Sequence, residues 1–209
     1  MDEVIYRDVT KEDYKRIKEL IGEAFHINEF IKDENFLDSL LNCYLQECII
    51  DSSFSKVAEK NNKVVGIILA SSEKDKNRLK KMHNTLSFIY SIFKIFIANK
   101  ENKKALKEFS KIRETYDEII KGKEDDFEGC IELFIVSKES RGFGVGKTLM
   151  NYLYNYMKSI DVKSMYLYTD SICNYGFYDS QNFKRLNEKK IYLDYSQEEL
   201  NIFLYGYKF

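Results

Sequence analysis

The chain has 209 residues, of which 44% are hydrophobic and 32% charged, and its formal net charge at pH 7 is −1. This length and composition predict one globular domain over residues 1–209 that buries a core, and they exclude a disordered chain. The near-zero charge gives no indication of a nucleic-acid partner, and two histidines are too few for the usual histidine metal sites, so we expect no metal.

The first third of the chain predicts a strand, two helices and a hairpin. It begins Met-Asp-Glu without an apolar stretch, so we expect no signal peptide. Residues 4–9 are typical of a short strand. Apolar residues at helical spacing follow Thr10 and Asp33, and both of these residue types favour the start of a helix. Residues 55–70 predict a hairpin that turns at the Asn-Asn pair at 61–62, which tolerates positive φ.

Residues 71–127 form a charged segment with helical periodicity. Apolar residues recur at helical spacing in two stretches, which comprise Leu86, Ile89, Phe93 and Phe96, and then Leu106, Phe109, Ile112, Tyr116 and Ile119. We interpret the segment as a helical pair packed on the core, with Lys and Glu on its solvated face. Because the stripe is rich in Phe and Ile, the alternative is a lid over a binding site or a contact between two copies of the chain. Lys94 interrupts the apolar run at 86–98, which is too short to span a bilayer, so we expect no membrane partner.

Three alternate glycines follow the next apolar run, which covers residues 131–136. Gly142, Gly144 and Gly146 lie between this run and a helical pattern that begins near Leu149. A strand, a glycine loop and a helix together can hold phosphate, because glycines let backbone N–H groups approach the ligand and the helix N-terminus favours negative charge. This segment therefore predicts a phosphorylated ligand.

The spacing of these glycines decides which of the known phosphate-binding motifs the loop matches. A Walker A loop would need a glycine where Arg141 stands, and in a dinucleotide fingerprint the third glycine would come one residue later. The pattern that fits is [R/Q]-x-x-G-x-[G/A], filled by Arg141, Gly144 and Gly146. This pattern resembles the acyl-CoA loop of the GNAT superfamily of N-acyltransferases. The alternative is an ordinary glycine-rich turn between a strand and a helix.

A second segment resembles the other GNAT signature, a strand followed by a helix that carries F-Y-x-x-x-G-F. Residues 164–169 alternate like a strand, and Phe177, Tyr178 and Phe183 match the signature. Asn182 replaces the usual glycine, and Asn is the next best residue for a left-handed helix end. The two signatures occur in the family's order and cover the last third of the chain.

The resemblance implies a fold and an activity. The fold would be α/β (α+β), with a mixed, mostly antiparallel central sheet flanked by helices and a helical insertion at 71–127. The activity would be that of an N-acetyltransferase that transfers an acetyl group from acetyl-CoA to a primary amine of a small molecule or peptide, by direct attack in a ternary complex. The alternative is a non-catalytic acyl-CoA-binding regulatory module. Four cysteines without a C-x-x-C pair fit reduced thiols in a cytoplasmic protein.

The resemblance also implies which residues bind acetyl-CoA. The backbone of the strand would pair with the pantetheine arm through Phe134, Ile135 and Val136. The loop amides would hold the pyrophosphate, with added charge from the basic side chains; these residues are Arg141, Gly142, Phe143, Gly144, Val145, Gly146 and Lys147. Ser171 and Asn174 are further candidate contacts, although Ser171 occupies a position at which the family often has Asn.

Two residues are candidates for proton transfer. Tyr178 matches the family's catalytic tyrosine, and a phenol is protonated at neutral pH and can protonate a leaving thiolate. The alternative is that Tyr178 only packs in the core. Glu132 lies in an apolar strand with the same alternation as Phe134 and Val136, so it must face water, a partner or the site. We take it as the candidate base, with a plain polar edge position as the alternative.

The end of the chain predicts two closing strands, at residues 190–195 and 202–209. In the family this end helps to shape the acceptor pocket. The tyrosines that could line such a pocket, or equally pack on the faces of the sheet, are Tyr192, Tyr195, Tyr205 and Tyr207.

Overall fold

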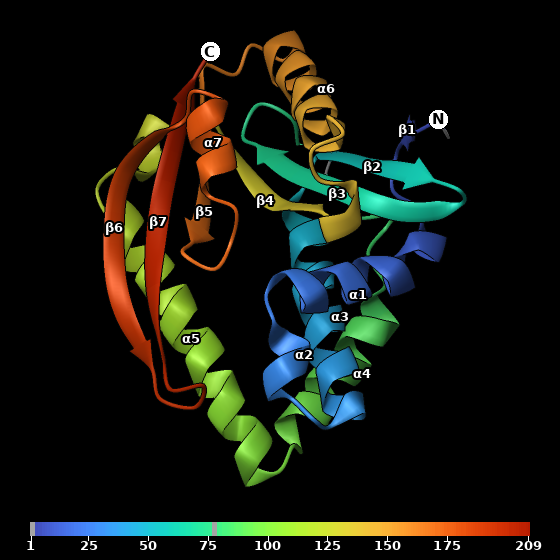
Figure 1. Ribbon diagram of the computed structural model, residues 1–209, viewed down its shortest axis with the longest axis vertical. Helices are drawn as coiled ribbons and strands as arrows, with labels where there is room; N and C mark the ends of the chain where they lie inside the picture. The colour runs from blue at the N-terminus through green and yellow to red at the C-terminus, as the bar shows by residue number, and fades with distance from the viewer. Residues whose placement is uncertain (1–2, 77–78) are drawn as a thin grey trace.

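A seven-stranded sheet in the order β1-β2-β3-β4-β5-β7-β6 lies at the centre of the computed structural model, which describes residues 3–76 and 79–209 (Figure 1). Neighbouring strands are antiparallel except for β4 and β5. The predicted mixed, mostly antiparallel sheet is thereby confirmed. The strands are β1 (Ile5–Arg7), β2 (Phe54–Lys60), β3 (Lys63–Ser72), β4 (Gly129–Val136), β5 (Ser164–Asp170), β6 (Lys184–Leu193) and β7 (Glu198–Lys208).

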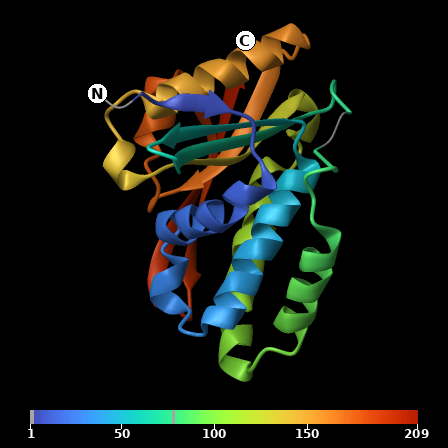
Figure 2. The same ribbon diagram turned by 90° about the vertical axis from the view of Figure 1, so that its right-hand side faces the viewer.

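Helices cover both faces of this sheet (Figures 1 and 2). They are α1 (Tyr14–Ala24), α2 (Ile27–Phe30), α3 (Glu34–Asp51), α4 (Thr85–Phe96), α5 (Lys100–Ile120), α6 (Val145–Ser159) and α7 (Gly176–Ser180). The carboxylate of Asp33 accepts hydrogen bonds from the N–H groups of Asn35 and Phe36 and so begins α3, as the sequence predicts. The insertion is helical as expected, because α4 and α5 occupy most of it.

The described residues form three core clusters, two of which lie on opposite faces of β2, β3 and β4. On one face α1 and α3 pack against the strands through fully buried residues such as Ile17, Leu45 and Ile67. On the opposite face α6 packs through Leu149 and Leu153, together with α7. A third cluster lies where α5 packs along β6 and β7. Burial of these apolar faces provides the main driving force for the fold.

The hairpin prediction is confirmed in detail. Asn61 and Asn62 join β2 to β3 with φ values of 52° and 58°, which is the left-handed region that a two-residue hairpin turn requires. By contrast, the predicted closing strand at 190–195 is too short, since β6 begins at Lys184. Residues 184–190 are all exposed and, apart from Leu186, charged or polar, and they pair through their backbones with β7 at the edge of the sheet. Without a buried face they show no hydrophobic alternation from which a strand could be predicted.

Candidate active site

Strands β4 and β5 diverge shortly after they begin. Their parallel pairing is limited to Gly129 with Met165 and Cys130 with Tyr166, and beyond this point no ladder joins them in the part of the chain that the structure describes. Further along, β4 pairs with β3 and β5 pairs with β7, so the two strands separate (Figure 1). The edge of β4 that faces β5 is therefore open for an extended ligand to add along it, as a peptide adds to the edge of a sheet.

A β-bulge occurs at Glu132, where this divergence begins. On β4, Ile131 pairs with Ala70 and Leu133 pairs with the preceding residue of β3, so Glu132 is the extra residue. The bulge breaks the alternation that the sequence suggests. Leu133 belongs to the core under α1 and α3, Phe134 packs on the α6 side, and the expected shared face of Glu132 with Phe134 is wrong. Bulges are frequent beside active sites because they redirect a side chain.

Glu132 is oriented by a neighbouring strand. The Ser71 hydroxyl donates a hydrogen bond of 2.6 Å to Oε1 of Glu132. The negative charge of Glu132 also acts on groups of α3 and β5. Burial raises the pKa of the Cys48 thiol and of the Tyr166 hydroxyl well above their usual values, and Glu132 adds to both shifts. Because such shifts keep the thiol and the phenol protonated, neither group is a base at neutral pH, and Glu132 remains the candidate base of this part of the site.

Tyr178 lies in the core between α7 and β4. Only 8% of it is exposed, and its ring contacts those of Phe134, with centroids 6.3 Å apart, and Tyr205, at 5.9 Å. Burial raises the pKa of Tyr178 well above its ordinary value, and the nearby Cys173 and Asp170 add to this effect. The hydroxyl is therefore kept protonated throughout the neutral range, which is the state a general acid needs.

The glycine loop leads directly into α6. Gly142 and Gly144 adopt φ values of 81° and 78°, and Gly144 is the N-cap of the helix. Around both positions a Cβ would meet nothing within 4 Å, so the space before the loop is open. The first N–H groups of an α-helix have no partner within the helix, and here they belong to Val145, Gly146 and Lys147. An open, positively polarised loop of this kind fits a pyrophosphate.

The basic and aromatic residues of the loop differ in how firmly they are held. Nε of Arg141 donates a hydrogen bond of 3.3 Å to the carbonyl oxygen of Val136, which ties the loop to the end of β4. Phe143 is 78% exposed and projects from the loop. Gly146 lies against the Phe134 ring, where an added Cβ would approach to 3.4 Å, so this glycine permits close packing of α6 on β4.

The other two predicted cofactor residues lie between β5 and α7. The N–H of Asn201 donates a hydrogen bond of 3.1 Å to the hydroxyl oxygen of Ser171, and the N–H of Ser171 donates to the Asn201 carbonyl at 2.9 Å. Ser171 therefore also anchors this loop to β7. Asn174 is exposed, and its carbonyl accepts the N–H of Phe177 as the chain turns into α7. Asn182 has the expected left-handed conformation, with φ of 65°.

An open β4 edge, a helix N-terminus behind a glycine loop and a buried tyrosine thus converge on one side of the sheet. Residues 14–183 match the model of the acetyltransferase (GNAT) family. The chain belongs to this family. The resemblance drawn from the two signatures is confirmed, and the chain is an acyltransferase. The family uses acetyl-CoA as its cosubstrate, and the open loop and the open strand edge fit that molecule.

Solved structures show the same fold in proteins with different acceptors. An N-acetyltransferase from Staphylococcus aureus Mu50 has a TM-score of 0.54 and 14% identity, with 99% of this chain and 98% of that chain covered. Ribosomal-protein-alanine N-acetyltransferase from Brucella melitensis has a TM-score of 0.56 and 15% identity, with 98% and 99% covered. A Drosophila melanogaster polyamine N-acetyltransferase that forms N-acetylagmatine has a TM-score of 0.55 and 10% identity, with 99% and 100% covered. No curated protein matches the sequence.

A cavity of about 570 Å³ opens on the face of this GNAT sheet that α5 covers. Its walls come from four parts of the chain: the end of β3, α5 with the turn after it, the start of β4, and β5. The lining residues are Ser71, Ser72, Glu73, Asp117, Ile120, Glu124, Phe127, Glu128, Gly129, Cys130, Tyr166 and Tyr168. Ser71, which donates to Glu132, connects this cavity to the candidate base.

The charged residues that line this cavity are all acidic. Glu73, Asp117 and Glu124 are exposed acidic residues of its lining, and Glu128 is paired with Lys74 at 3.0 Å. Its inner wall is aromatic. Tyr168 stacks on Tyr116 of α5 with ring centroids 4.3 Å apart, and Tyr166 lies beside it on β5. Carboxylates with aromatic faces form the kind of surface that attracts ammonium groups.

Most of this lining could not be predicted from the sequence. The residues that form it are separated by up to a hundred positions, and acidic residues in a charged helix give no signal of what they face. None of the four tyrosines expected to line a pocket or to pack on the sheet belongs to this lining. Tyr205 is fully buried beside Tyr178, Tyr195 and Tyr207 pack against the core, and Tyr192 is 43% exposed.

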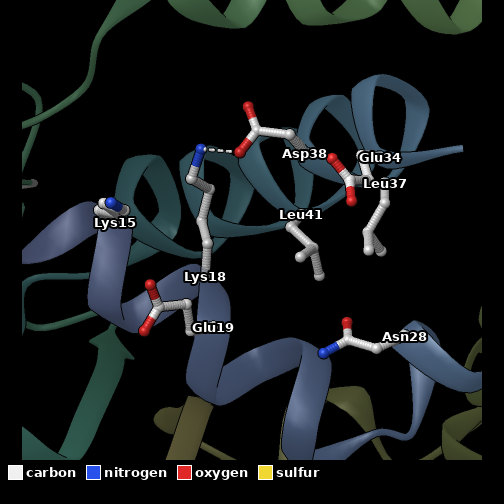
Figure 3. A pocket seen from close by; sticks show the side chains of 8 residues that line it. All are labelled: Lys15, Lys18, Glu19, Asn28, Glu34, Leu37, Asp38 and Leu41. Atoms are coloured by element: carbon white, nitrogen blue, oxygen red, sulfur yellow. Dashed lines mark hydrogen bonds and ion pairs between the residues drawn. The ribbon is translucent and has the colours of Figure 1, made fainter.

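A second hollow, of about 220 Å³, lies between α1, α2 and α3 (Figure 3). Both acidic and basic residues line it, and Nζ of Lys18 forms an ion pair of 2.5 Å with Oδ1 of Asp38. It contains none of the predicted site residues. Cys173, near the site, is no nucleophile at neutral pH, because burial raises the pKa of its thiol to about 12.

Proposed function

We propose that this GNAT enzyme transfers the acetyl group of acetyl-CoA to the primary amine of a small cationic acceptor, such as a diamine or polyamine. The observation that carries the choice of acceptor is the cavity with an acidic rim and an aromatic wall, whose lining includes Ser71, the hydrogen-bond donor to Glu132. The fold does not choose between acceptors, since solved neighbours include both a polyamine and a ribosomal-protein acetyltransferase. Acidic charge in a cavity favours small amines that carry a second positive charge.

The proposed reaction is direct attack within a ternary complex. The pantetheine arm lies along the open edge of β4, and the acceptor comes from the α5 face. The neutral amine nitrogen attacks the thioester carbon, so that a C–N bond forms as the C–S bond breaks. Before the attack Glu132 takes one proton from the bound ammonium group and so leaves the nitrogen neutral. In the attack the nitrogen loses a second proton to water, and Tyr178 gives a proton to the departing thiolate. Positioning both reactants beside the divergent strands supplies much of the rate.

The choice of acceptor is tested by thiol release from acetyl-CoA with a panel of amines. We expect kcat/KM for agmatine and diamines to exceed that for neutral amines of similar length, and for peptide N-termini, by about 10-fold or more. Glu124→Gln should raise KM for a diamine by roughly 5-fold with little change in kcat, because one charge at the rim steers the free cation. Asp125→Asn removes the neighbouring charge, which is absent from the lining, and is the matched control. Equal rates for neutral and cationic amines would overturn this acceptor.

The role of Glu132 is tested by Glu132→Gln. The amide oxygen still accepts the Ser71 hydrogen bond, so the fold and the affinity for CoA should be retained. We expect kcat to fall by roughly 10-fold to 100-fold near neutral pH, which is within the range for a positioned base. The loss should shrink as the pH rises, because the fraction of neutral amine in solution grows. Ser71→Ala keeps the carboxylate but removes the hydrogen bond that orients it, so its loss of kcat should be smaller than that of Glu132→Gln. A loss in Glu132→Gln that does not change with pH would favour a purely structural role.

A further inference from the structure

Helix α4 presents an apolar surface to solvent. Seven residues make up this surface, which we call the α4 face: Leu86, Ile89, Tyr90, Ile92, Phe93, Phe96 and Ile97. Leu86 is 82% exposed and Phe96 is 76% exposed. At about 3.6 residues per turn these residues share one side of the helix. Contiguous exposed apolar surface of this kind marks a site of interaction with a protein or a membrane.

The orientation of α4 is fixed by polar contacts on its other side. Nδ2 of Asn42 on α3 donates to the Ser87 hydroxyl at 3.1 Å and to the Ser91 hydroxyl at 2.9 Å, and it also approaches the Ser87 carbonyl at 3.3 Å. Ser91 is buried in this contact. A surface helix of a globular protein normally turns its apolar stripe to the core and its polar side to water. In α4, Ser87 and Ser91 contact α3 and Ile95 packs against the core, whereas the residues of the α4 face are exposed. Figure 2 shows α4 at the edge of the molecule.

The segment that carries the α4 face is positively charged, and Asp33, before α3, is a carboxylate that acts electrostatically on its Lys94. Residues 79–100 contain Lys80, Lys81, Lys94 and Lys100 but no Asp or Glu. Among the residues that the structure describes, these four lysines take part in none of the ion pairs. Nζ of Lys94 lies 5.4 Å from the centre of the Tyr90 ring, so a positive charge sits at the margin of the apolar surface. Lysines at both ends and at one margin are typical of a helix that lies at a lipid interface.

We propose that the α4 face docks this enzyme on an anionic membrane surface, with α4 lying in the plane of the interface. A second copy of the chain would also cover the apolar residues, but two-fold packing of α4 on α4 would bring two sets of four lysines together. Like charges that face each other oppose association, whereas anionic lipid headgroups attract the same lysines. Within residues 3–76 and 79–209, no helix is long and apolar enough to cross a membrane. Docking needs only one apolar side of a helix, so the proposal departs from the expectation of no membrane partner, which rests on the length needed to span a bilayer. It is independent of the proposed acceptor.

The test is sedimentation of the full chain with vesicles of phosphatidylcholine, alone or mixed with phosphatidylglycerol. We expect binding to the mixed vesicles that weakens with added salt, and little binding to phosphatidylcholine alone. The double variant Phe93→Ser/Phe96→Ser and the double variant Lys80→Gln/Lys81→Gln should each lower vesicle affinity by about 10-fold or more. Ile5→Ser changes an apolar residue of β1 that is 56% exposed and lies outside the α4 face, so its binding should equal that of the original chain.

Two further measurements keep the test decisive. Circular dichroism and CoA affinity should be unchanged in both double variants, which shows that they fold. Light scattering reports the oligomeric state of each variant. A dimer that Phe93→Ser/Phe96→Ser converts to a monomer, without vesicle binding by the original chain, would overturn the proposal in favour of a second copy. Equal binding to neutral and anionic vesicles would also overturn it, because the lysines would then have no part.

Discussion

Replacement of Gly144 by Asp is expected to weaken the binding of acetyl-CoA and CoA by at least about 100-fold, or roughly 2.8 kcal/mol. Two effects combine at this position. Gly144 has φ of 78° at the N-cap of α6, a conformation that costs a residue with a Cβ about 1–3 kcal/mol. The added carboxylate would also stand where the loop amides and the helix N-terminus attract the pyrophosphate. Isothermal titration with CoA measures the change.

Gly144→Ala separates the two effects. A Cβ at this position meets no protein atom within 4 Å, so alanine introduces the backbone strain without a clash or a charge. We expect its CoA affinity to lie between those of the original chain and Gly144→Asp. Dephospho-CoA keeps the pyrophosphate and should respond to both variants as CoA does, whereas pantetheine lacks it and should respond to neither. Unchanged CoA affinity in Gly144→Asp would show that the loop does not hold the pyrophosphate.

The phosphate loop could be predicted from the sequence because its signal is local. Gly142 and Gly144 are needed where the backbone takes positive φ, and Asn182 is tolerated at a left-handed helix end for a related reason. Each of these constraints acts within a few residues, so a short motif records it. The same applies to the Asn61-Asn62 turn, which requires left-handed conformations at two successive positions.

The orientation of Glu132 could not be predicted, because it depends on pairing with another strand. Alternation along β4 places Glu132 with Phe134, but the register with β3 skips Glu132 and turns it toward Ser71. A bulge adds one residue to one strand and leaves no mark in the hydrophobic pattern. The cavity beside it is formed by segments that only the folded sheet and α5 bring together.

For residues 71–127, the sequence predicts the helices correctly but does not predict which way the apolar side of α4 faces. Its periodicity correctly predicts two helices, and α5 packs on β6 and β7 through buried residues such as Ile119, as the packing interpretation expects. For α4, periodicity identifies an apolar stripe but not the direction in which it points. That direction is set by the contact of Asn42 with Ser87 and Ser91, three polar residues whose partnership appears only in the folded chain.

Replacement of Tyr178 by Phe is expected to lower kcat by roughly 10²-fold to 10⁴-fold, the usual contribution of a positioned general acid. The substitution removes one hydroxyl and almost no volume from a side chain packed against Phe134 and Tyr205, so the fold and CoA affinity should be retained. Because the hydroxyl acts on the departing thiolate, the loss should appear in kcat rather than in KM. Steady-state thiol release with the best amine measures both constants.

Tyr205→Phe is the matched control for this substitution. Tyr205 is a fully buried neighbour whose hydroxyl interacts with Arg185 and Asp179, so its loss should affect stability while kcat stays within a few-fold. The pH profile gives a second test. Burial raises the pKa of Tyr178, so its protonated form persists to higher pH than that of an exposed phenol, and the acid should not be lost as the pH rises through the range in which the amine becomes neutral. A decline of kcat near the ordinary tyrosine pKa, or full activity in Tyr178→Phe, would refute the role of Tyr178 as the acid.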